Sequence, residues 1–209
     1  KRGLETEAIR LAHSYERVMP GPDYFNSIAR YWRVFAGIDI DSAQACRIFL
    51  SSIIDVASFP LTELSNPTAS ETAKVLENTY RAVNIALMEE WGHFAELIGV
   101  DLFEIVDAIR MRPTHSNIRE PGLGVGGYCL TKDPYFPQTA IDTFFAETKS
   151  NFPLTTHAME INRNMPQSAA LRIKELFRGD LRGRDILVMG ASYRGAVGDT
   201  RFSPSEALV

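Results

Sequence analysis

The sequence predicts an α/β protein built around one long helix, with the end of one α/β domain before it and the start of a second α/β domain after it. Three observations carry this prediction. Apolar residues recur every three or four positions from Pro67 to Ile98, strand-like and helix-like segments alternate before Pro67, and an apolar strand-like run, Asp185–Gly190, stands near the end.

Composition excludes several classes of protein. The 209 residues are 45% hydrophobic and 23% charged, which is typical of a globular protein with a substantial core. The net charge of -4 comes from interspersed acids and bases, so we expect neither a nucleic-acid partner nor an anionic membrane surface. No apolar run approaches the roughly 20 residues that a membrane span needs.

The cysteines and histidines point to a reducing compartment and to no metal site. Only Cys46 and Cys129 are present, without a signal-like apolar start, which favours a cytoplasmic protein. The four histidines are scattered, and no metal-ligand spacing occurs. The chain begins without a methionine and stops where a helix starts, so we expect a fragment.

The first region, residues 1–64, reads as the last part of an α/β domain. The run Ile9–Ser14 predicts a strand that leads into a charged turn, and the aromatic and branched run Tyr31–Ile38 predicts another strand. Asp41, with Gln44 three positions later, predicts the start of a helix. Cys46 falls on its apolar face and is therefore most simply a core residue.

The middle region, residues 65–165, contains the long helix. Asn66-Pro67 supplies a cap and a proline where its missing N–H costs nothing, and the apolar spacing lasts until Gly99. At 1.5 Å per residue this helix would be on the order of 45 Å long, longer than a small domain is wide. Because apolar residues lie on more than one face, we expect it to join two domains and to form a homodimer through residues 67–98.

The remaining elements follow from caps and prolines. Predicted in order are a helix Asp101–Met111, a helix from about Asp133, helices Pro153–Met165 and Pro166–Phe177, a strand Asp185–Gly190, and a helix capped by Ser203. Residues 166–209 would then be the beginning of the second α/β domain.

The stretch Pro121–Pro134, PGLGVGGYCLTKDP, has the composition of a catalytic loop. A thiol in a glycine-rich loop, with a carboxylate four residues later, suits a covalent thio-intermediate, so Cys129 is the candidate nucleophile. A small buried thiol is the commoner role for a lone cysteine. Asp133 before a proline is by itself best read as a helix cap.

Two further motifs carry polar groups that chemistry could use. Lys74, Asn78 and Arg81 share one face of the long helix; such a stripe is usually solvated, but a lysine and an amide one turn apart can both donate to an oxyanion. Glu16 and Arg17 lie in the turn after the first strand, where two solvent-facing side chains would be the simplest interpretation.

Four segments together resemble, in order and spacing, the UDP-glucose/GDP-mannose dehydrogenase family of nucleotide-sugar 6-dehydrogenases. They are SYERVMPG, ETAKVLENTYRAVNIALMEE, PGLGVGGYCLTKDP and GASYRGAVGDTRFSPSE, and the resemblance covers essentially the whole chain. It implies a homodimer through the long helix, flanked by an NAD-binding Rossmann domain and a Rossmann-like domain for the nucleotide sugar. It also implies two NAD-dependent oxidations of the C6 alcohol to the carboxylate.

The resemblance assigns roles to individual residues. Cys129 would add to the C6 aldehyde and pass through a thiohemiacetal to a thioester, with Lys74 and Asn78 steadying the oxyanion and a water. Asp133 would act in thioester hydrolysis, and Glu16 matches the family's glutamate. The residues expected to bind substrate are Gly126, Gly127, Tyr128 and Arg194, and the one expected at the active site or the cofactor phosphates is Arg201.

Within the family, ENTYRAVNIAL and ERVMPG resemble the enzymes of UDP-N-acetylmannosamine and UDP-N-acetylglucosamine more than UDP-glucose 6-dehydrogenase, which stays an alternative. Another alternative is a non-catalytic dimerisation module; a thiol acyl-transferase lacks a partner histidine. Gly122, Gly124 and Gly127 fit G-x-G-x-x-G, but no strand precedes them, so the dinucleotide motif is rejected. Because no other copy occurs in these 209 residues, we expect them to be inactive alone.

Overall fold

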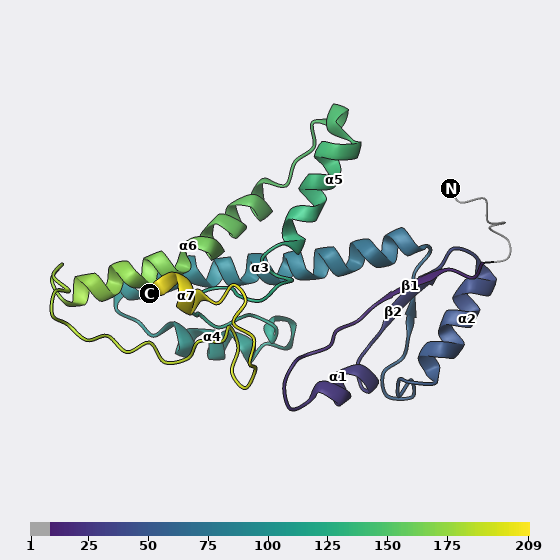
Figure 1. Cartoon of the computed structure of the whole chain (residues 1–209), viewed down its shortest axis with the longest axis horizontal. Coiled ribbons are helices and arrows are strands. Elements are labelled where there is room, and N and C mark those ends of the chain that lie inside the picture. The colour runs from purple at the N-terminus through teal and green to yellow at the C-terminus, as the bar shows by residue number, and fades with distance from the viewer. Residues whose placement is uncertain (1–8) are drawn as a thin grey trace. The chain divides into compact units, whose positions relative to one another are not determined.

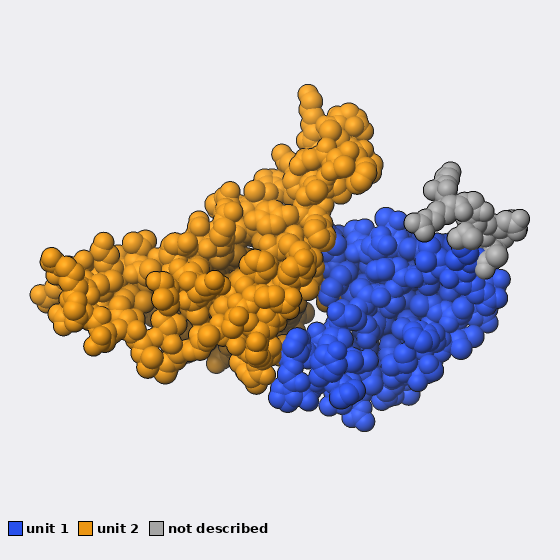
Figure 2. Space-filling model, in the orientation of Figure 1, with its two compact units in different colours: residues 1–76 blue, residues 77–209 orange. Residues whose placement is uncertain are grey.

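The computed structural model describes residues 9–209, which form two compact units (Figure 2). Unit 1 ends at Leu76 and unit 2 runs from Glu77 to Val209, so the boundary falls inside the long helix. The protein is mixed α/β around that helix (Figure 1), as the sequence predicts. In the described part of the chain, no helix is long and apolar enough to cross a membrane.

Unit 1 is a small sheet covered by one helix. Its elements are β1 (Ala12–Tyr15), α1 (Tyr24–Ala29), β2 (Val34–Gly37), α2 (Ile40–Ser51), β3 (Thr62–Glu63) and the first turns of α3 (Pro67–Ile98). The strand order is β1-β2-β3, antiparallel between β1 and β2 and parallel between β2 and β3. Both predicted strands are therefore present, although shorter than expected.

The core of unit 1 lies between β2 and α2. Phe35 from β2 is fully buried against Ala43 and Leu50 of α2, and Cys46 packs at its edge, so Cys46 is the core residue that the sequence predicts. Burial accordingly raises the pKa of the Cys46 thiol. The predicted cap was wrong by two residues: Asp39, not Asp41, accepts from the Ser42 N–H at 2.7 Å.

The long helix α3 begins and ends where the sequence predicts. Asn66 Oδ1 accepts from the Ala69 N–H at 2.9 Å, and Pro67 is the first helical residue. At the other end Gly99 has a φ of +74°, a left-handed conformation that glycine adopts without strain. Caps therefore fix both ends of a helix of 32 residues.

Unit 2 is helical and contains the rest of α3. Its other elements are α4 (Leu102–Arg110), the 3₁₀ turns η2 (Pro113–His115), η3 (Asp133–Tyr135) and η4 (Ala146–Thr148), α5 (Phe136–Phe144), α6 (Pro153–Leu176) and α7 (Pro204–Leu208). Met88 and Ala95 of α3 pack against Leu102 and Val106 of α4. On α6, Asn162 Nδ2 donates to the Ala82 carbonyl of α3 at 2.9 Å, which ties these two helices together.

Two expectations for unit 2 were wrong. Pro153–Met165 and Pro166–Phe177 are one helix, because Pro166 is accommodated inside α6 at a buried position. The run Asp185–Gly190 forms no strand: Leu187 and Met189 are exposed, and no neighbouring strand among the described residues pairs with it. A parallel-sheet sequence needs covered faces and paired edges to become a strand. The caps at Asp101 and Ser203 are confirmed.

Candidate functional site

The loop that carries Cys129 closes on itself just before η3. The Cys129 carbonyl accepts from the N–H groups of Lys132 at 3.2 Å and Asp133 at 2.9 Å, and Thr131 Oγ1 donates to the Gly127 carbonyl at 2.8 Å. Cys129 is exposed, unlike the core residue Cys46. The turn thus presents the thiol to solvent and fixes the chain that links it to Asp133.

Asp133 is a buried, doubly bonded carboxylate and not a helix cap. It is the first residue of η3, only 6% exposed, and its side chain makes no capping bond. Asn78 Nδ2 of α3 donates to Oδ2 at 2.7 Å, and Lys132 Nζ donates to Oδ1 at 2.6 Å. The interpretation of Asp133 as a cap is therefore wrong, because the N-cap position of η3 is Lys132 and the Asp133 carboxylate accepts from two side chains instead.

Asn78 brings the long helix into this site. It is 1% exposed, and its Oδ1 has no hydrogen-bond partner among the described residues. A buried carbonyl oxygen left unpaired costs about 1–3 kcal/mol, so a donor at this position would be stabilising. The geometry fits an amide that orients Asp133 with one atom and can accept from a water or a ligand with the other.

Lys132 is the residue that the sequence reasoning missed. Its Nζ lies 4.9 Å from the ring centre of Tyr128 and 4.8 Å from that of Phe136, in addition to its bond to Asp133. That bond raises the pKa of Lys132, and a smaller electrostatic contribution comes from Cys129. A lysine placed between a thiol and a carboxylate in the motif CLTKD was the signal that could have identified it.

The glycines before Cys129 allow another segment to come close. A Cβ on Gly126 would lie 2.4 Å from Tyr193 Cβ and 2.7 Å from the Phe202 carbonyl oxygen, and the Gly127 N–H donates to the Arg201 carbonyl at 3.0 Å. These contacts explain why glycine stands at 126. Contact of Gly126 and Gly127 with substrate stays a prediction.

Arg201 lies beside the loop but already has an acidic partner. Its Nη2 and Nε donate to the Asp199 carboxylate at 2.7 and 2.9 Å, and its guanidinium lies 5.7 Å from the Tyr128 ring centre. The Arg201 side chain lowers the pKa of Asp199 to about 2. Arg194 is exposed on the same segment, and its role as a substrate contact stays a prediction.

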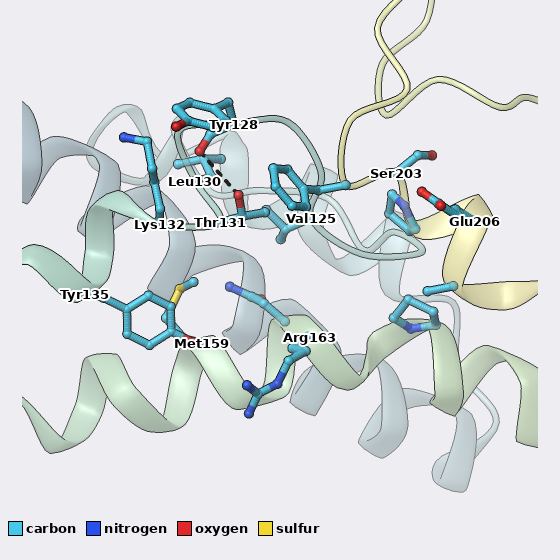
Figure 3. A pocket seen from close by; sticks show the side chains of 15 residues that line it. Val125, Tyr128, Leu130, Thr131, Lys132, Tyr135, Met159, Arg163, Ser203 and Glu206 are labelled. Carbon is cyan, nitrogen blue, oxygen red and sulfur yellow. Dashed lines mark hydrogen bonds between the residues drawn. The ribbon is translucent and has the colours of Figure 1, made fainter.

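A cavity of about 440 Å³ lies next to this loop (Figure 3). The Cys129 loop, α6 and the segment around α7 contribute its walls. Its lining residues are Val125, Tyr128, Leu130, Thr131, Lys132, Tyr135, Met159, Asn162, Arg163, Pro166, Phe202, Ser203, Pro204, Glu206 and Ala207. Of the candidate residues, Tyr128 reaches it, whereas Cys129 and Asp133 do not line it.

Glu16 and Lys74 meet within unit 1. Lys74 Nζ donates to the Glu16 carbonyl at 3.2 Å and lies 5.6 Å from the Tyr15 ring centre. The Glu16 carboxylate accepts from the Val18 N–H, which folds it onto its own loop. The candidate residues thus form two groups: Glu16 with Lys74 in unit 1, and Asn78 with Asp133 beside the Cys129 turn in unit 2.

Comparison with known proteins agrees with these motifs. Residues 68–164 match the family model for the central domain of the UDP-glucose/GDP-mannose dehydrogenase family. UDP-N-acetyl-D-mannosamine dehydrogenase of Methanocaldococcus jannaschii is 34% identical over 209 residues, which are 100% of this chain and 45% of that protein. The chain therefore spans less than half the length of this curated relative.

Solved structures show the same relationship. UDP-D-ManNAc dehydrogenase of Pyrococcus horikoshii matches with a TM-score of 0.77 and 32% identity, over 95% of this chain and 45% of that chain. A UDP-glucose dehydrogenase of Pyrobaculum islandicum has a TM-score of 0.81 over 94% of this chain and 44% of that chain, and at 23% identity it supports the fold alone. The chain belongs to the UDP-glucose/GDP-mannose dehydrogenase family and carries its central domain in residues 68–164.

Proposed function

We propose that the protein carrying this chain oxidises the C6 alcohol of a UDP-sugar to the uronate in two NAD-dependent steps, through a covalent intermediate on Cys129. A UDP-N-acetylhexosamine is the favoured substrate, because the M. jannaschii and P. horikoshii relatives are dehydrogenases of UDP-N-acetyl-D-mannosamine. UDP-glucose is the alternative sugar.

The observation that carries the proposal is the arrangement behind the thiol. Cys129 is exposed, and its own carbonyl accepts from the Asp133 N–H. The Asp133 side chain is buried and is oriented by Asn78 and Lys132. A thiolate adds readily to an aldehyde carbon, giving a thiohemiacetal, and a thioester later loses the thiolate to water. A rigid carboxylate one turn away is suited to orient that water or accept its proton.

The remaining candidate residues have supporting roles. Asn78 Oδ1 would accept a hydrogen bond from the attacking water while Asn78 Nδ2 keeps Asp133 in place. Lys132 would keep positive charge beside the thiol and the Asp133 carboxylate. Lys74 would stabilise the oxyanion at the reacting carbon, and Glu16 would contact the substrate or its water.

NAD is implied by the family resemblance, and the described residues alone do not fit it. Gly122, Gly124 and Gly127 have the spacing of a dinucleotide loop, but no strand leads into them and a turn, not a helix, follows. Arg201, the candidate phosphate contact, is paired with Asp199. The two hydride transfers are therefore not assigned to any residue here.

We further propose that α3 forms a homodimer and that the protein works in the cytoplasm. Phe94, Leu97 and Ile98 are large apolar side chains exposed on the unit 2 part of α3, as a helix face covered by a second copy would be. Cys46 and Cys129 are both free thiols, which suits a reducing compartment.

The test is the stoichiometry of oxidation. The protein carrying this chain is incubated with NAD and, separately, UDP-N-acetylmannosamine, UDP-N-acetylglucosamine, UDP-glucose and GDP-mannose, and NADH is counted per sugar consumed. We expect two NADH per sugar, with a UDP-N-acetylhexosamine preferred. A folded protein that binds NAD but produces no NADH with any of the four would contradict the proposal and favour a dimerisation module.

A further inference from the structure

Arg33 is a buried arginine that the motifs leave without a role. It stands directly before β2 and is only 7% exposed. Its Nη1 donates to the Tyr15 carbonyl at 3.2 Å, and its Nη2 donates to the Ile28 carbonyl at 3.3 Å. The guanidinium therefore joins the last residue of β1, immediately before Glu16, to the end of α1.

The position is costly for a cation unless it serves a purpose. Arginine is rarely this buried without a carboxylate partner, and here Nε has no hydrogen-bond partner among the described residues. Burial lowers the pKa of Arg33, the negative charge of Glu16 raises it, and the positive charge of Arg17 lowers it. Among the described residues, the guanidinium is therefore held by two backbone carbonyls and by no carboxylate.

The chain that carries Glu16 is held by two cations at consecutive carbonyls. Arg33 donates to the Tyr15 carbonyl, and Lys74 Nζ donates to the next carbonyl, that of Glu16, at 3.2 Å. Arg17 links the same segment to the residues before β2 by donating to the Trp32 carbonyl at 2.6 Å. It also donates to the Tyr15 hydroxyl at 2.9 Å. The backbone around Glu16 is therefore fixed while its carboxylate stays on the surface side.

We propose that Arg33 is a positioning residue that fixes the Glu16 segment against Lys74 through its bond to the Tyr15 carbonyl. It acts through Glu16 and does not itself contact the substrate. The inference rests on the proposed function for its catalytic consequence, whereas the structural part concerns unit 1 alone.

The catalytic consequence is tested with a double-mutant cycle in the protein carrying this chain. Arg33→Met removes the charge and both bonds with little change of volume, and Glu16→Gln removes the carboxylate charge. We expect Arg33→Met to lower kcat/KM about a hundredfold, as a displaced catalytic group does. In the Glu16→Gln background, Arg33→Met should lower kcat/KM less than threefold, because Arg33 acts through Glu16.

Two variants separate positioning from general damage. Arg30→Met, a matched change at an exposed arginine after α1, should leave kcat/KM within twofold. Arg33→Lys keeps a cation but cannot reach both carbonyls, so it should recover part of the loss even if Arg33→Met folds poorly. Equal losses from Arg33→Met with and without Glu16, in folded protein, would overturn the inference.

Whether Arg33 fixes the Glu16 segment can be measured by hydrogen exchange, without any enzyme activity. The Val18 N–H is bonded to the Glu16 carboxylate, so its hydrogen exchange reports directly on the position of that side chain. We expect faster exchange at Val18 in Arg33→Met and Arg33→Lys than in Arg30→Met, with the core amides of α2 unchanged. Unchanged exchange at Val18 would overturn the inference. An inactive wild type would contradict the proposed function and leave this measurement decisive for Arg33.

Discussion

Asp133 in unit 2 and Glu16 in unit 1 are two candidate catalytic carboxylates that the protein holds in opposite ways. The Asp133 side chain is buried and receives bonds from Asn78 and Lys132 at both oxygens. The backbone at Glu16 is held by bonds from Arg33 to the Tyr15 carbonyl and from Lys74 to the Glu16 carbonyl, and among the described residues the Glu16 carboxylate accepts from the Val18 N–H. In Asp133 the carboxylate itself is held by hydrogen bonds, whereas at Glu16 hydrogen bonds hold the backbone and leave the carboxylate exposed.

Because of this difference, we expect replacement of the two carboxylates to affect stability and reaction rate differently. Replacing Asp133 leaves the buried Asn78 amide without its acceptor, so both the stability of unit 2 and the rate of the reaction should fall. Replacing Glu16 removes an exposed carboxylate, so the reaction rate should fall while the stability of unit 1 stays nearly unchanged. Each of the following predictions compares the two regions or perturbs one of them.

The largest expected difference is in turnover. Asp133→Asn removes the charge that orients or deprotonates the hydrolytic water, and we expect uronate formation to fall by about 10²–10⁴-fold. The measurement is the rate of uronate release by the protein carrying this chain, with Asp142→Asn as the control at an exposed aspartate on α5. A rate for Asp133→Asn equal to that of the control would remove Asp133 from the mechanism.

Stability should separate the two carboxylates next. Asp133→Ala leaves Asn78 Nδ2 buried and unpaired, which we expect to lower the free energy of unfolding of unit 2 by about 1–3 kcal/mol. Glu16→Ala should change that of unit 1 by less than about 0.5 kcal/mol.

Tryptophan fluorescence can follow each unit by itself in urea. The chain has two tryptophans, Trp32 in unit 1 and Trp91 in unit 2, so Trp32→Phe and Trp91→Phe backgrounds each leave one reporter. Equal losses of unfolding free energy in Asp133→Ala and Glu16→Ala would refute the distinction between the buried, bonded carboxylate and the exposed one.

A smaller effect is expected where the loop meets the segment after α6. Gly126→Ala places a methyl group 2.4 Å from Tyr193 Cβ, which should destabilise unit 2 by at least about 1 kcal/mol and speed amide exchange at Gly127. Gly122→Ala is the matched control, since a Cβ there has no atom within 4 Å. Slow exchange at Gly127 in both variants would show that this close approach does not hold the loop.

The smallest effect should come from a surface pair. Arg201 lowers the pKa of Asp199 from the ordinary 3.8 to about 2. Because the folded-state pKa lies below the unfolded one, the stabilisation is complete above pH 4 and is lost as the pH falls toward 2. The Asp199 side-chain NMR signal should titrate near pH 2 and shift upward in Arg201→Gln; an unshifted midpoint would mean that the pair does not form in solution.

The sequence predicts those elements whose signals are local. Asn66, Pro67 and Gly99 define α3 to the residue, and Ser203 marks α7, because caps depend on neighbours in the chain. The strand expected at Asp185–Gly190 failed for the opposite reason, since a strand needs partners that its own sequence cannot supply. Pro166 lies within α6 at a position where it and the preceding Met165 are buried, which the sequence around the proline does not signal.

The sequence names the candidate site residues one by one but does not show which of them are bonded to each other. Cys129 and Asp133 follow from their motif, but the bond from Asn78 to Asp133 joins residues 55 positions apart. Lys132 and Arg33 were missed because a charged residue in a motif or beside a strand is usually solvated. The burial of Arg33 and the bonding partners of both residues appear only once the chain is folded.

The central claim is that Cys129 carries the sugar as a covalent intermediate, and peptide mass spectrometry tests it most directly. Asp133→Asn protein is mixed with NAD and UDP-N-acetylmannosamine, quenched in acid and digested with trypsin, which places Cys129 in residues 120–132 and Cys46 in residues 34–47. We predict a thioester adduct on residues 120–132 alone, absent without NAD. An unmodified 120–132 peptide while uronate still forms, or an adduct on residues 34–47, would contradict the account.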